Sequence, residues 1–208
     1  MPRRDLTVIK LGGSHAFAPH LADWIDAIAK CAGRIVVVPG GGPFADAVRD
    51  AQPKMGFGDR AAHRMALLAM EQYGCALASL APRFRLADSL PEIDQALIEM
   101  LVPVWLPTRM ALAAPDIPWS WDVTSDSLAA WLAGELGARL LLLMKHAGAS
   151  PVSMAELTRQ GVVDAAFASF QQASGVPACV VGANDHAALA DFISGTRDAA
   201  RVSPLAIS

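Results

Sequence analysis

Lys10-Leu11-Gly12-Gly13-Ser14 follows the short apolar run Leu6–Ile9, and a second glycine cluster, Gly40-Gly41-Gly42, follows the apolar run Ile35–Val38. Glycine lets the backbone approach a ligand closely, so that successive N–H groups can point at an anion. A helix that begins after each loop would add the positive end of its dipole. Lys10 stands where the first strand ends, within reach of the same anion. Together the two stretches predict a phosphate site for a nucleoside triphosphate.

Each glycine loop also has a plain structural interpretation, a tight strand-to-helix turn with a solvated lysine. Three glycines in a row cost roughly 0.5–1 kcal/mol each to order relative to alanine, which argues against a simple turn at 40–42. The first loop is not a Walker A motif, because Lys10 precedes its glycines, and the chain has no Gly-x-Gly-x-x-Gly helix start. A dinucleotide-binding oxidoreductase is therefore disfavoured.

Short apolar runs alternate with helical patterns along the chain. Apolar runs without polar alternation are typical of strands buried on both faces of a sheet. The expected strands are Thr7–Leu11, Ile35–Pro39, Phe84–Ala87, Val102–Leu106, Leu140–Met144 and Ala178–Gly182. Their alternation with helices predicts an open α/β sandwich with a largely parallel sheet.

Two of the expected helices lie between the second and third strands. A short helix should follow Pro43, with Phe44, Ala47 and Val48 facing inward. A longer helix should run from about Asp59 to Tyr73 and stop at Gly74, because glycine commonly ends helices.

Ligands in such sheets bind beyond the carboxyl ends of the strands. The candidates at that edge are Lys10, Gly12, Gly40, Asp122 and Lys145. Lys145 can be either a solvated lysine or a ligand-binding one, since both are common at a strand end.

The polar stretch Trp121–Ser127 precedes an apolar helical pattern. Ser125 or Asp126 can serve as a helix cap. Capping explains one or two of these polar groups, and the surplus indicates either hydrogen bonds to a ligand or a carboxylate that holds a lysine.

Composition limits the functional classes. The chain has 208 residues, is 53% hydrophobic and carries a net charge of −3, so it offers no basic surface for nucleic acid. We expect a single domain over residues 1–195 and a frayed C-terminal tail over residues 196–208. No apolar run is long enough for a signal peptide or a membrane span. The three cysteines and five histidines show no metal-ligand spacing, so we expect reduced thiols, no protein-bound metal and a cytoplasmic protein.

Three stretches in this order resemble the amino acid kinase family. Lys10–Ser14 is similar to its opening strand and glycine loop, Val38–Pro43 to its second loop, and Thr124–Ala129 to its polar-polar-Asp helix start. The resemblance covers about Leu6 to Ile193. It implies a three-layer α/β/α sandwich with a largely parallel central sheet and the transfer of the ATP γ-phosphoryl group to an oxyanion.

The resemblance also implies a role for each matching residue. Lys10 would contact the transferring phosphoryl group, and Asp126 would orient Lys10 and also Lys145. The ATP phosphates would lie against Gly12, Gly13, Ser14 and Lys145. The acceptor would lie against Gly40, Gly41, Gly42, Asp122, Thr124 and Ser125. ATP and Mg²⁺ are the implied cofactors, with no metal ligand assigned to the chain.

This sequence departs from the larger family members after its late strand. The family's usual Thr-Asp-x-x-Gly is here Met144–Gly148, with Lys145 in place of the acidic residue. A later lysine that many members place against ATP has no clear counterpart in 161–170. We therefore expect Lys145 to supply that cation.

The compact length and the segment Gly40–Asp46 are most similar to a branch that includes kinases of aminomethylfuran phosphate, in methanofuran-type cofactor biosynthesis. The expected acceptor is thus a phosphorylated small molecule, a phosphate monoester such as aminomethylfuran phosphate that becomes a diphosphate. Arg60 and Arg64 are candidates to bind the acceptor phosphate or to form a solvated helix face, and His15 and His63 are candidates for acceptor contact. We expect a homo-oligomer, a dimer or higher. The alternative is a non-catalytic protein that binds or stores a nucleotide or oxyanion on the same fold.

Overall fold

The computed structural model describes residues 5–145 and 154–194. In this part of the chain, six parallel strands form one sheet with the order β3-β4-β2-β1-β5-β6. The strands are β1 (Thr7–Leu11), β2 (Ile35–Pro39), β3 (Phe84–Ala87), β4 (Val102–Trp105), β5 (Leu140–Met144) and β6 (Ala178–Val181). Four strands have the predicted bounds, and β4 and β6 each end one residue earlier.

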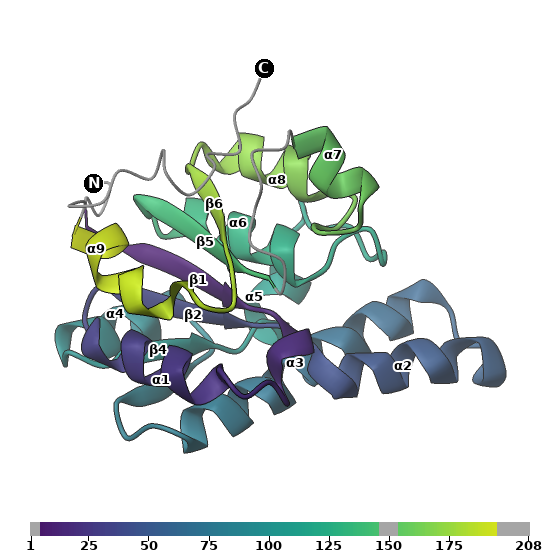
Figure 1. Cartoon of the computed structure of the whole chain (residues 1–208). Helices are drawn as coiled ribbons and strands as arrows, with labels where there is room; N and C mark the ends of the chain where they lie inside the picture. Colours follow the sequence, from purple (N-terminus) through teal and green to yellow (C-terminus); the bar gives the residue numbers. More distant parts are fainter. Residues whose placement is uncertain (1–4, 146–153, 195–208) are drawn as a thin grey trace.

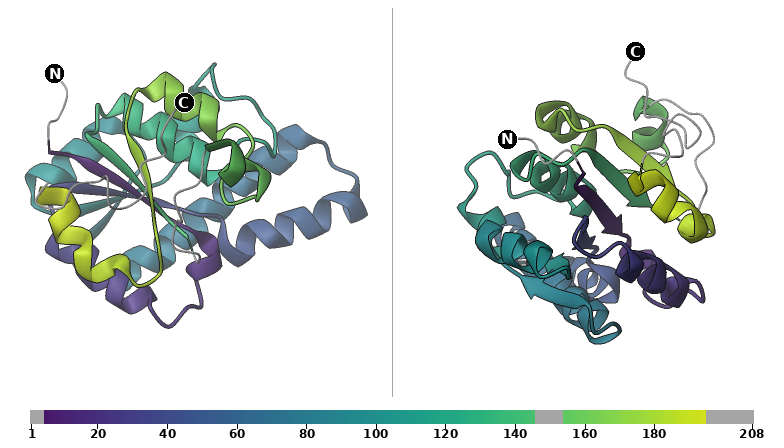
Figure 2. Two further views of the ribbon diagram at one scale, coloured as in Figure 1. Left: turned by 45° about the horizontal axis from the view of Figure 1, so that its top comes forward. Right: turned by 90° about the vertical axis from the view of Figure 1, so that its left-hand side faces the viewer.

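Helices cover both faces of the sheet, which confirms the three-layer α/β/α sandwich (Figures 1 and 2). One face packs against α1 (Leu21–Lys30), the C-terminal half of α3 (Asp59–Ser79) and α9 (Leu189–Ser194). The other packs against α4 (Leu90–Ile98), α6 (Ser125–Glu135) and α8 (Phe167–Ser174). The remaining elements are η1 (Gly13–His15), α2 (Gly42–Met55), α5 (Thr108–Ala113), α7 (Met154–Arg159) and η2 (Asp185–Ala188).

The central strand β1 determines where Lys10 points. Ile9 and Leu11 belong to the hydrophobic cluster beneath α1, whereas Val8 belongs to the cluster beneath α6. Because successive side chains of a strand alternate between faces, Lys10 shares the α6 face with Val8. In the sheet, Lys10 is flanked by Val38 of β2 and Leu143 of β5. The lysine therefore leaves the middle of the sheet toward the start of α6.

Helices α2 and α3 form a hairpin that projects beyond the sheet (Figure 1). Helix α2 has 14 residues and is not short, because the chain continues helically to the left-handed Gly56. The predicted inward face was also wrong at two positions. Ala45 and Val48 are buried, whereas Phe44 is 38% exposed and Ala47 is exposed. In the hairpin, α2 packs mainly against α3 and not against the sheet, so α2 buries a narrower stripe than a helix on the sheet does.

Helix α3 does not stop at Gly74 but continues to Ser79. Gly74 is buried where the helix crosses the sheet, and a Cβ there would lie 3.3 Å from Pro39 Cγ and 3.5 Å from Val104 Cγ1. This glycine therefore serves close helix–sheet packing rather than helix termination. Among the helices of residues 5–145 and 154–194, none has the length and apolar character needed to span a membrane.

Candidate active site

The two glycine loops pack directly against each other at the carboxyl edge of the sheet. Gly40 N donates a hydrogen bond of 2.8 Å to Leu11 O. A Cβ on Gly13 would collide with the backbone of Gly42, and one on Gly40 would collide with Gly13 N. Gly42 has a φ of +56° and starts α2. Glycine is thus needed here for the contact between the two loops.

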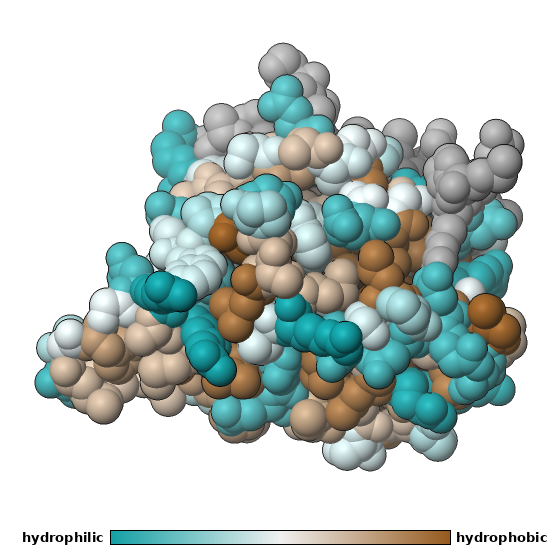
Figure 3. Space-filling model, turned by 180° about the vertical axis from the view of Figure 1, so that it is seen from behind, coloured by the Kyte–Doolittle hydropathy of each residue, from teal (hydrophilic) through white to brown (hydrophobic). Residues whose placement is uncertain are grey.

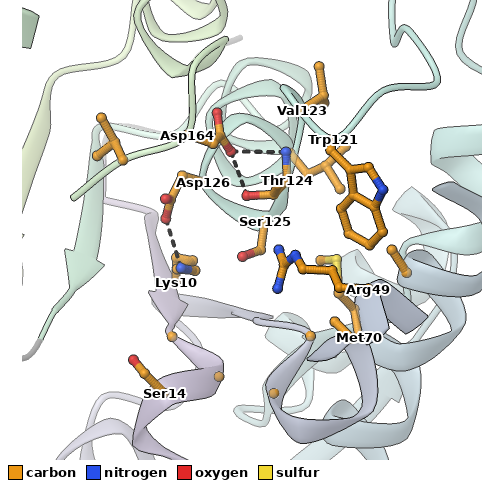
Figure 4. Close-up of a pocket in the computed structure, with 18 of the residues that line it drawn as sticks. Lys10, Ser14, Arg49, Met70, Trp121, Val123, Thr124, Ser125, Asp126 and Asp164 are labelled. Carbon is orange, nitrogen blue, oxygen red and sulfur yellow. Dashed lines mark hydrogen bonds and ion pairs between the residues drawn. The ribbon is translucent and has the colours of Figure 1, made fainter. Parts of the chain in front are cut away.

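Two lysines share one buried carboxylate beside these loops. Lys10 Nζ lies 2.8 Å from Asp126 Oδ1, and Lys145 Nζ lies 2.8 Å from Asp126 Oδ2. The three side chains are 7%, 17% and 5% exposed for Lys10, Lys145 and Asp126. Figure 4 shows Lys10 pointing from β1 to Asp126 at the start of α6. With both lysines protonated, this group of three, the Lys–Asp–Lys triad, has a net charge of +1.

The triad shifts the titration of its members. Burial first and then Lys10 lower the pKa of Lys145, Asp126 partly opposes both, and the resulting pKa is about 8. Burial alone would raise the pKa of Asp126, but the adjacent ammonium groups, Lys10 first, hold it below its usual range. Asp126 is therefore ionised at neutral pH, and Lys145 loses its proton in mildly alkaline solution.

Asp164 holds the start of α6 and was not predicted from the sequence. Its Oδ2 accepts hydrogen bonds from Thr124 N (3.0 Å), Thr124 Oγ1 (2.8 Å) and Ser127 N (3.0 Å), and its Oδ1 accepts one from Ser127 Oγ. Thr124 is the N-cap of α6 but makes no cap bond with its own side chain. In the sequence, Asp164 is 40 residues from Thr124, so no local pattern indicates this contact.

A cavity of about 540 Å³ lies in front of the triad. Of the predicted site residues, those that line it are Lys10, Gly12, Gly13, Ser14, Gly41, Gly42, Thr124, Ser125, Asp126 and Lys145. Gly40 lies behind the lining, in contact with Gly13, and Asp122 is exposed with its carbonyl bonded to Ala166 N at 3.0 Å. Most of the predicted residues thus converge on one space, and these two border it.

We call the end of the cavity away from β1 the distal end. It is bounded by Arg49, His63, Met70 and Trp121. Arg49 lies over the Trp121 ring, with its Cζ 4.7 Å from the ring centre, and Trp121 Nε1 donates to Gln52 Oε1 at 2.7 Å. In Figure 4, Trp121 and Arg49 face the space in front of Ser125. The distal end therefore offers an aromatic ring and a cation.

The distal end also contains a histidine that the sequence singled out. His63 is 4% exposed, and its Nε2 has no hydrogen-bond partner among the residues that the structure describes. Burial lowers the pKa of His63, and a bond to the Ser120 backbone partly opposes this, so the ring is neutral at pH 7. The other candidates do not line the cavity. His15 pairs with His20 at 2.8 Å, Arg60 stacks on Trp119, and Arg64 is exposed.

The acidic groups at this edge do not form a metal cage. Among the described residues, no three His, Cys, Asp or Glu side chains gather to hold a metal ion. Both Asp126 oxygens face lysines, and both Asp164 oxygens accept hydrogen bonds from α6. Mg²⁺ typically binds through substrate phosphates, waters and one or two carboxylates. The site therefore suits Mg²⁺ that arrives bound to a triphosphate.

Known proteins share this fold. The uridylate kinase from Archaeoglobus fulgidus superimposes with a TM-score of 0.69 at 19% identity, covering 91% of this chain and 96% of that one. The UMP kinase from Ureaplasma parvum gives a TM-score of 0.69 at 19% identity, covering 94% and 97%. At this level of identity, the likeness concerns the fold alone.

Sequence comparison identifies the family. The [5-(aminomethyl)furan-3-yl]methyl phosphate kinase of Methanocaldococcus jannaschii is 27% identical over 138 residues, which are 65% of this chain. The matched region spans 63% of that relative, less than two thirds of its length. A model of the amino acid kinase family matches residues 5–148, which contain both glycine loops and the triad. The chain therefore belongs to the amino acid kinase family.

Proposed function

We propose that this protein is an ATP-dependent small-molecule kinase that transfers the γ-phosphoryl group to an oxyanion acceptor. The observation that supports this most strongly is the buried Lys–Asp–Lys triad, at the point where two glycine loops and the start of α2 meet. A net positive charge in a partly dry site attracts phosphate oxygens far more strongly than a solvated lysine does. Family membership agrees with this assignment.

The geometry suits stabilisation of the phosphoryl group while it is transferred from ATP to the acceptor. The acceptor oxygen attacks the γ-phosphorus, the bond from phosphorus to the ADP oxygen breaks, and ADP leaves. Negative charge spreads over the phosphoryl oxygens meanwhile, and Lys10 and Lys145 would stabilise it while Asp126 fixes both ammonium groups. An acceptor that is already an anion needs no general base.

The substrates would occupy the two ends of the cavity. The ATP phosphates would lie against Gly12, Gly13 and Ser14, with Mg²⁺ bound to them. The acceptor would lie between Gly41–Gly42 and Thr124–Ser125 and extend to the distal end. Gly40 would support these contacts from behind the lining, whereas Asp122 is exposed and lies outside the lining.

The acceptor that we propose is a phosphate monoester attached to a small flat ring, such as aminomethylfuran phosphate, which becomes a diphosphate. The name of the Methanocaldococcus relative supports this choice. The distal end supports it as well, because Arg49 can pair with a phosphate and the Trp121 ring can stack on a flat substrate. Arg49, rather than Arg60 or Arg64, is the arginine in the lining.

The test is ADP release from MgATP with acceptors offered by class: carboxylates, carbamate, nucleoside monophosphates, prenyl phosphates and aminomethylfuran phosphate. We expect stimulation by a phosphate monoester and formation of its diphosphate. Binding of ATP without consumption in the presence of every class would instead support the non-catalytic alternative.

The variant that tests the site is Lys10→Ala. Loss of the ammonium group should reduce kcat by at least about 100-fold, a typical cost of one transition-state donor. Lys30→Ala, on the exposed end of α1, is the control and should keep full activity. Wild-type turnover by Lys10→Ala would refute the assignment of the site.

A further inference from the structure

One carboxylate from a distant loop fixes the first turn of α6. Asp164 accepts two backbone N–H bonds and two hydroxyl bonds from Thr124 and Ser127, so both of its oxygens are occupied. Figure 4 shows the two bonds from Thr124. Isolated helix starts leave such N–H groups unpaired. Here the pairing comes from the segment 161–165, which itself lines the cavity at Gly161, Val163, Asp164 and Ala165.

The turn held in this way contains Asp126. Thr124 and Ser127 flank Asp126 in the sequence, and both are bonded to Asp164. On the same loop, Ala166 N donates to Asp122 O at 3.0 Å, which ties the chain just before α6 to the start of α8. The direction in which Asp126 meets the two lysines is thus set by contacts made outside the triad.

Asp164 also meets the positive end of the α6 dipole. A carboxylate at a helix N-terminus is stabilised by the helix dipole. Asp164 occupies that position on α6, where it accepts hydrogen bonds from Thr124 N and Ser127 N. The contact therefore stabilises the first turn of α6 by charge as well as by hydrogen bonds.

We propose that Asp164 is a positioning residue of the phosphoryl-transfer centre. It fixes the first turn of α6, so that Asp126 holds the ammonium groups of Lys10 and Lys145 in place. This inference rests on the proposed kinase function for its effect on turnover. Its effect on the triad does not depend on turnover.

The principal variant is Asp164→Asn, which keeps the size of the side chain. It replaces one acceptor oxygen by an NH₂ group, which would face the N–H and hydroxyl donors of Thr124 and Ser127. The double variant Thr124→Val/Ser127→Ala removes both hydroxyl bonds and keeps the Asp164 charge and its two backbone bonds. The control is Glu92→Gln, since Glu92 also accepts a backbone N–H near a helix start, from Asp88 N at 2.8 Å, and does not line the cavity.

Two readouts separate positioning from simple stability. The first compares the change in kcat with the change in KM for MgATP, and the melting temperature is measured on the same samples. The second is the titration of Lys145, followed by NMR of ¹³Cε-labelled lysine in the ligand-free protein. The chain has four lysines, and Lys30→Arg/Lys54→Arg in all samples leaves only the signals of Lys10 and Lys145. Burial, Lys10 and Asp126 set the pKa of Lys145, and Asp164 reaches it only through Asp126.

In Asp164→Asn, we expect kcat to fall at least about tenfold, as small misplacements of catalytic groups do, with a smaller change in KM for MgATP. Because Asp126 raises the pKa of Lys145, a displaced Asp126 should move the Lys145 titration below its wild-type midpoint near pH 8. The double variant should shift both readouts in the same direction but less. Glu92→Gln should leave both at wild-type values even if its melting temperature falls.

The proposal is overturned if Asp164→Asn keeps the wild-type kcat and Lys145 titration, whatever its melting temperature. If Asp164→Asn does not fold, the double variant decides in the same way. If the wild-type protein turns over no acceptor, the kinase assignment fails, and the Lys145 titration alone still tests the positioning role.

Discussion

Lys10 and Lys145 share one buried counterion, the carboxylate of Asp126. Asp126 is a carboxylate with an ammonium group 2.8 Å from each oxygen, and it is almost completely buried. Buried ions are costly unless they are paired, so each member of the triad depends on the others. The arrangement also leaves one excess positive charge in the cavity, and this charge is what phosphate would recognise.

The charge of Lys145 predicts how anion binding depends on pH. Burial and Lys10 bring the pKa of Lys145 to about 8, so below this pH the triad carries +1 and above it the net charge approaches zero. We expect the Kd for MgATP to be flat from pH 6.5 to 7.5 and to rise through pH 8 and 9. Titration calorimetry in this range measures it.

The matched variant for this pH dependence is Lys145→Arg, whose guanidinium stays protonated throughout. Its Kd should show no alkaline rise. A wild-type Kd that is constant up to pH 9.5 would show that Lys145 does not supply the charge.

Removal of the shared carboxylate should destabilise the fold. Asp126→Asn leaves Lys10 and Lys145 buried and facing each other without a counterion, which costs about 3–5 kcal/mol in comparable buried pairs. Urea unfolding at pH 7 measures the loss. Asp126→Asn/Lys145→Met should recover part of it because one buried charge is gone. Equal stability of Asp126→Asn and wild type would contradict the pairing.

At the scale of elements, two loops from neighbouring strands must fit against each other without side chains. The first loop leads from β1 into η1, and the second leads from β2 into α2. The ordering cost of their glycines is offset by close backbone contact between the loops and by the hydrogen bond from Gly40 N to Leu11 O. The apolar strands beneath them hold both loops at one edge.

Gly13→Ala tests this contact. Its Cβ would overlap the backbone of Gly42, so the loops must separate. We expect a loss of about 1–3 kcal/mol in the free energy of unfolding, as for other overpacked sites, together with a fall in kcat. Gly58→Ala is the control, because its Cβ would meet nothing within 4 Å. Gly58 is the N-cap of α3, and its only expected loss is that alanine caps a helix less well than glycine does. Similar losses for both variants would argue against the loop contact.

At the scale of the whole molecule, the cavity lies between the sheet edge and the projecting α2–α3 hairpin. Arg49 and Gln52 of α2 both contact Trp121, and Gln52 Nε2 also donates to Asp59 Oδ1 of α3 at 2.9 Å. On the face seen in Figure 3, hydrophobic residues form separate patches between hydrophilic ones. The expected homo-oligomer stays a prediction.

Trp121 should report acceptor binding. It lines the distal end, whereas Trp24 and Trp105 are fully buried, so a ligand at that end should change the emission of Trp121. We expect the acceptor phosphate to alter tryptophan fluorescence and Trp121→Phe to abolish most of the change. Trp119→Phe should keep it, because Trp119 stacks on Arg60 outside the lining. An unchanged signal in Trp121→Phe would place the acceptor elsewhere.

Local sequence patterns were enough to predict the sheet, the edge at which the cavity lies and the position of Lys10 at that edge. These features follow from local patterns, because an apolar run without alternation specifies a buried parallel strand, and a glycine cluster after it specifies a loop at the carboxyl edge. The pairing of Lys10 and Lys145 with Asp126 could be predicted only with the family resemblance. The bounds of β1, β2 and β5 agree with the pattern residue for residue.

The contacts that support the candidate site join residues far apart in the sequence, and they became visible only in the folded chain. Asp164 meets Thr124 across 40 residues, and Trp121 meets Gln52 across 69. Gly74 ends no helix, because α3 packs closely against Pro39 of β2 and Val104 of β4 at this residue, and no pattern near Gly74 indicates that contact. Such contacts depend on where separate elements come to lie in space, and the polar residues that make them look in the sequence like ordinary caps and solvated side chains.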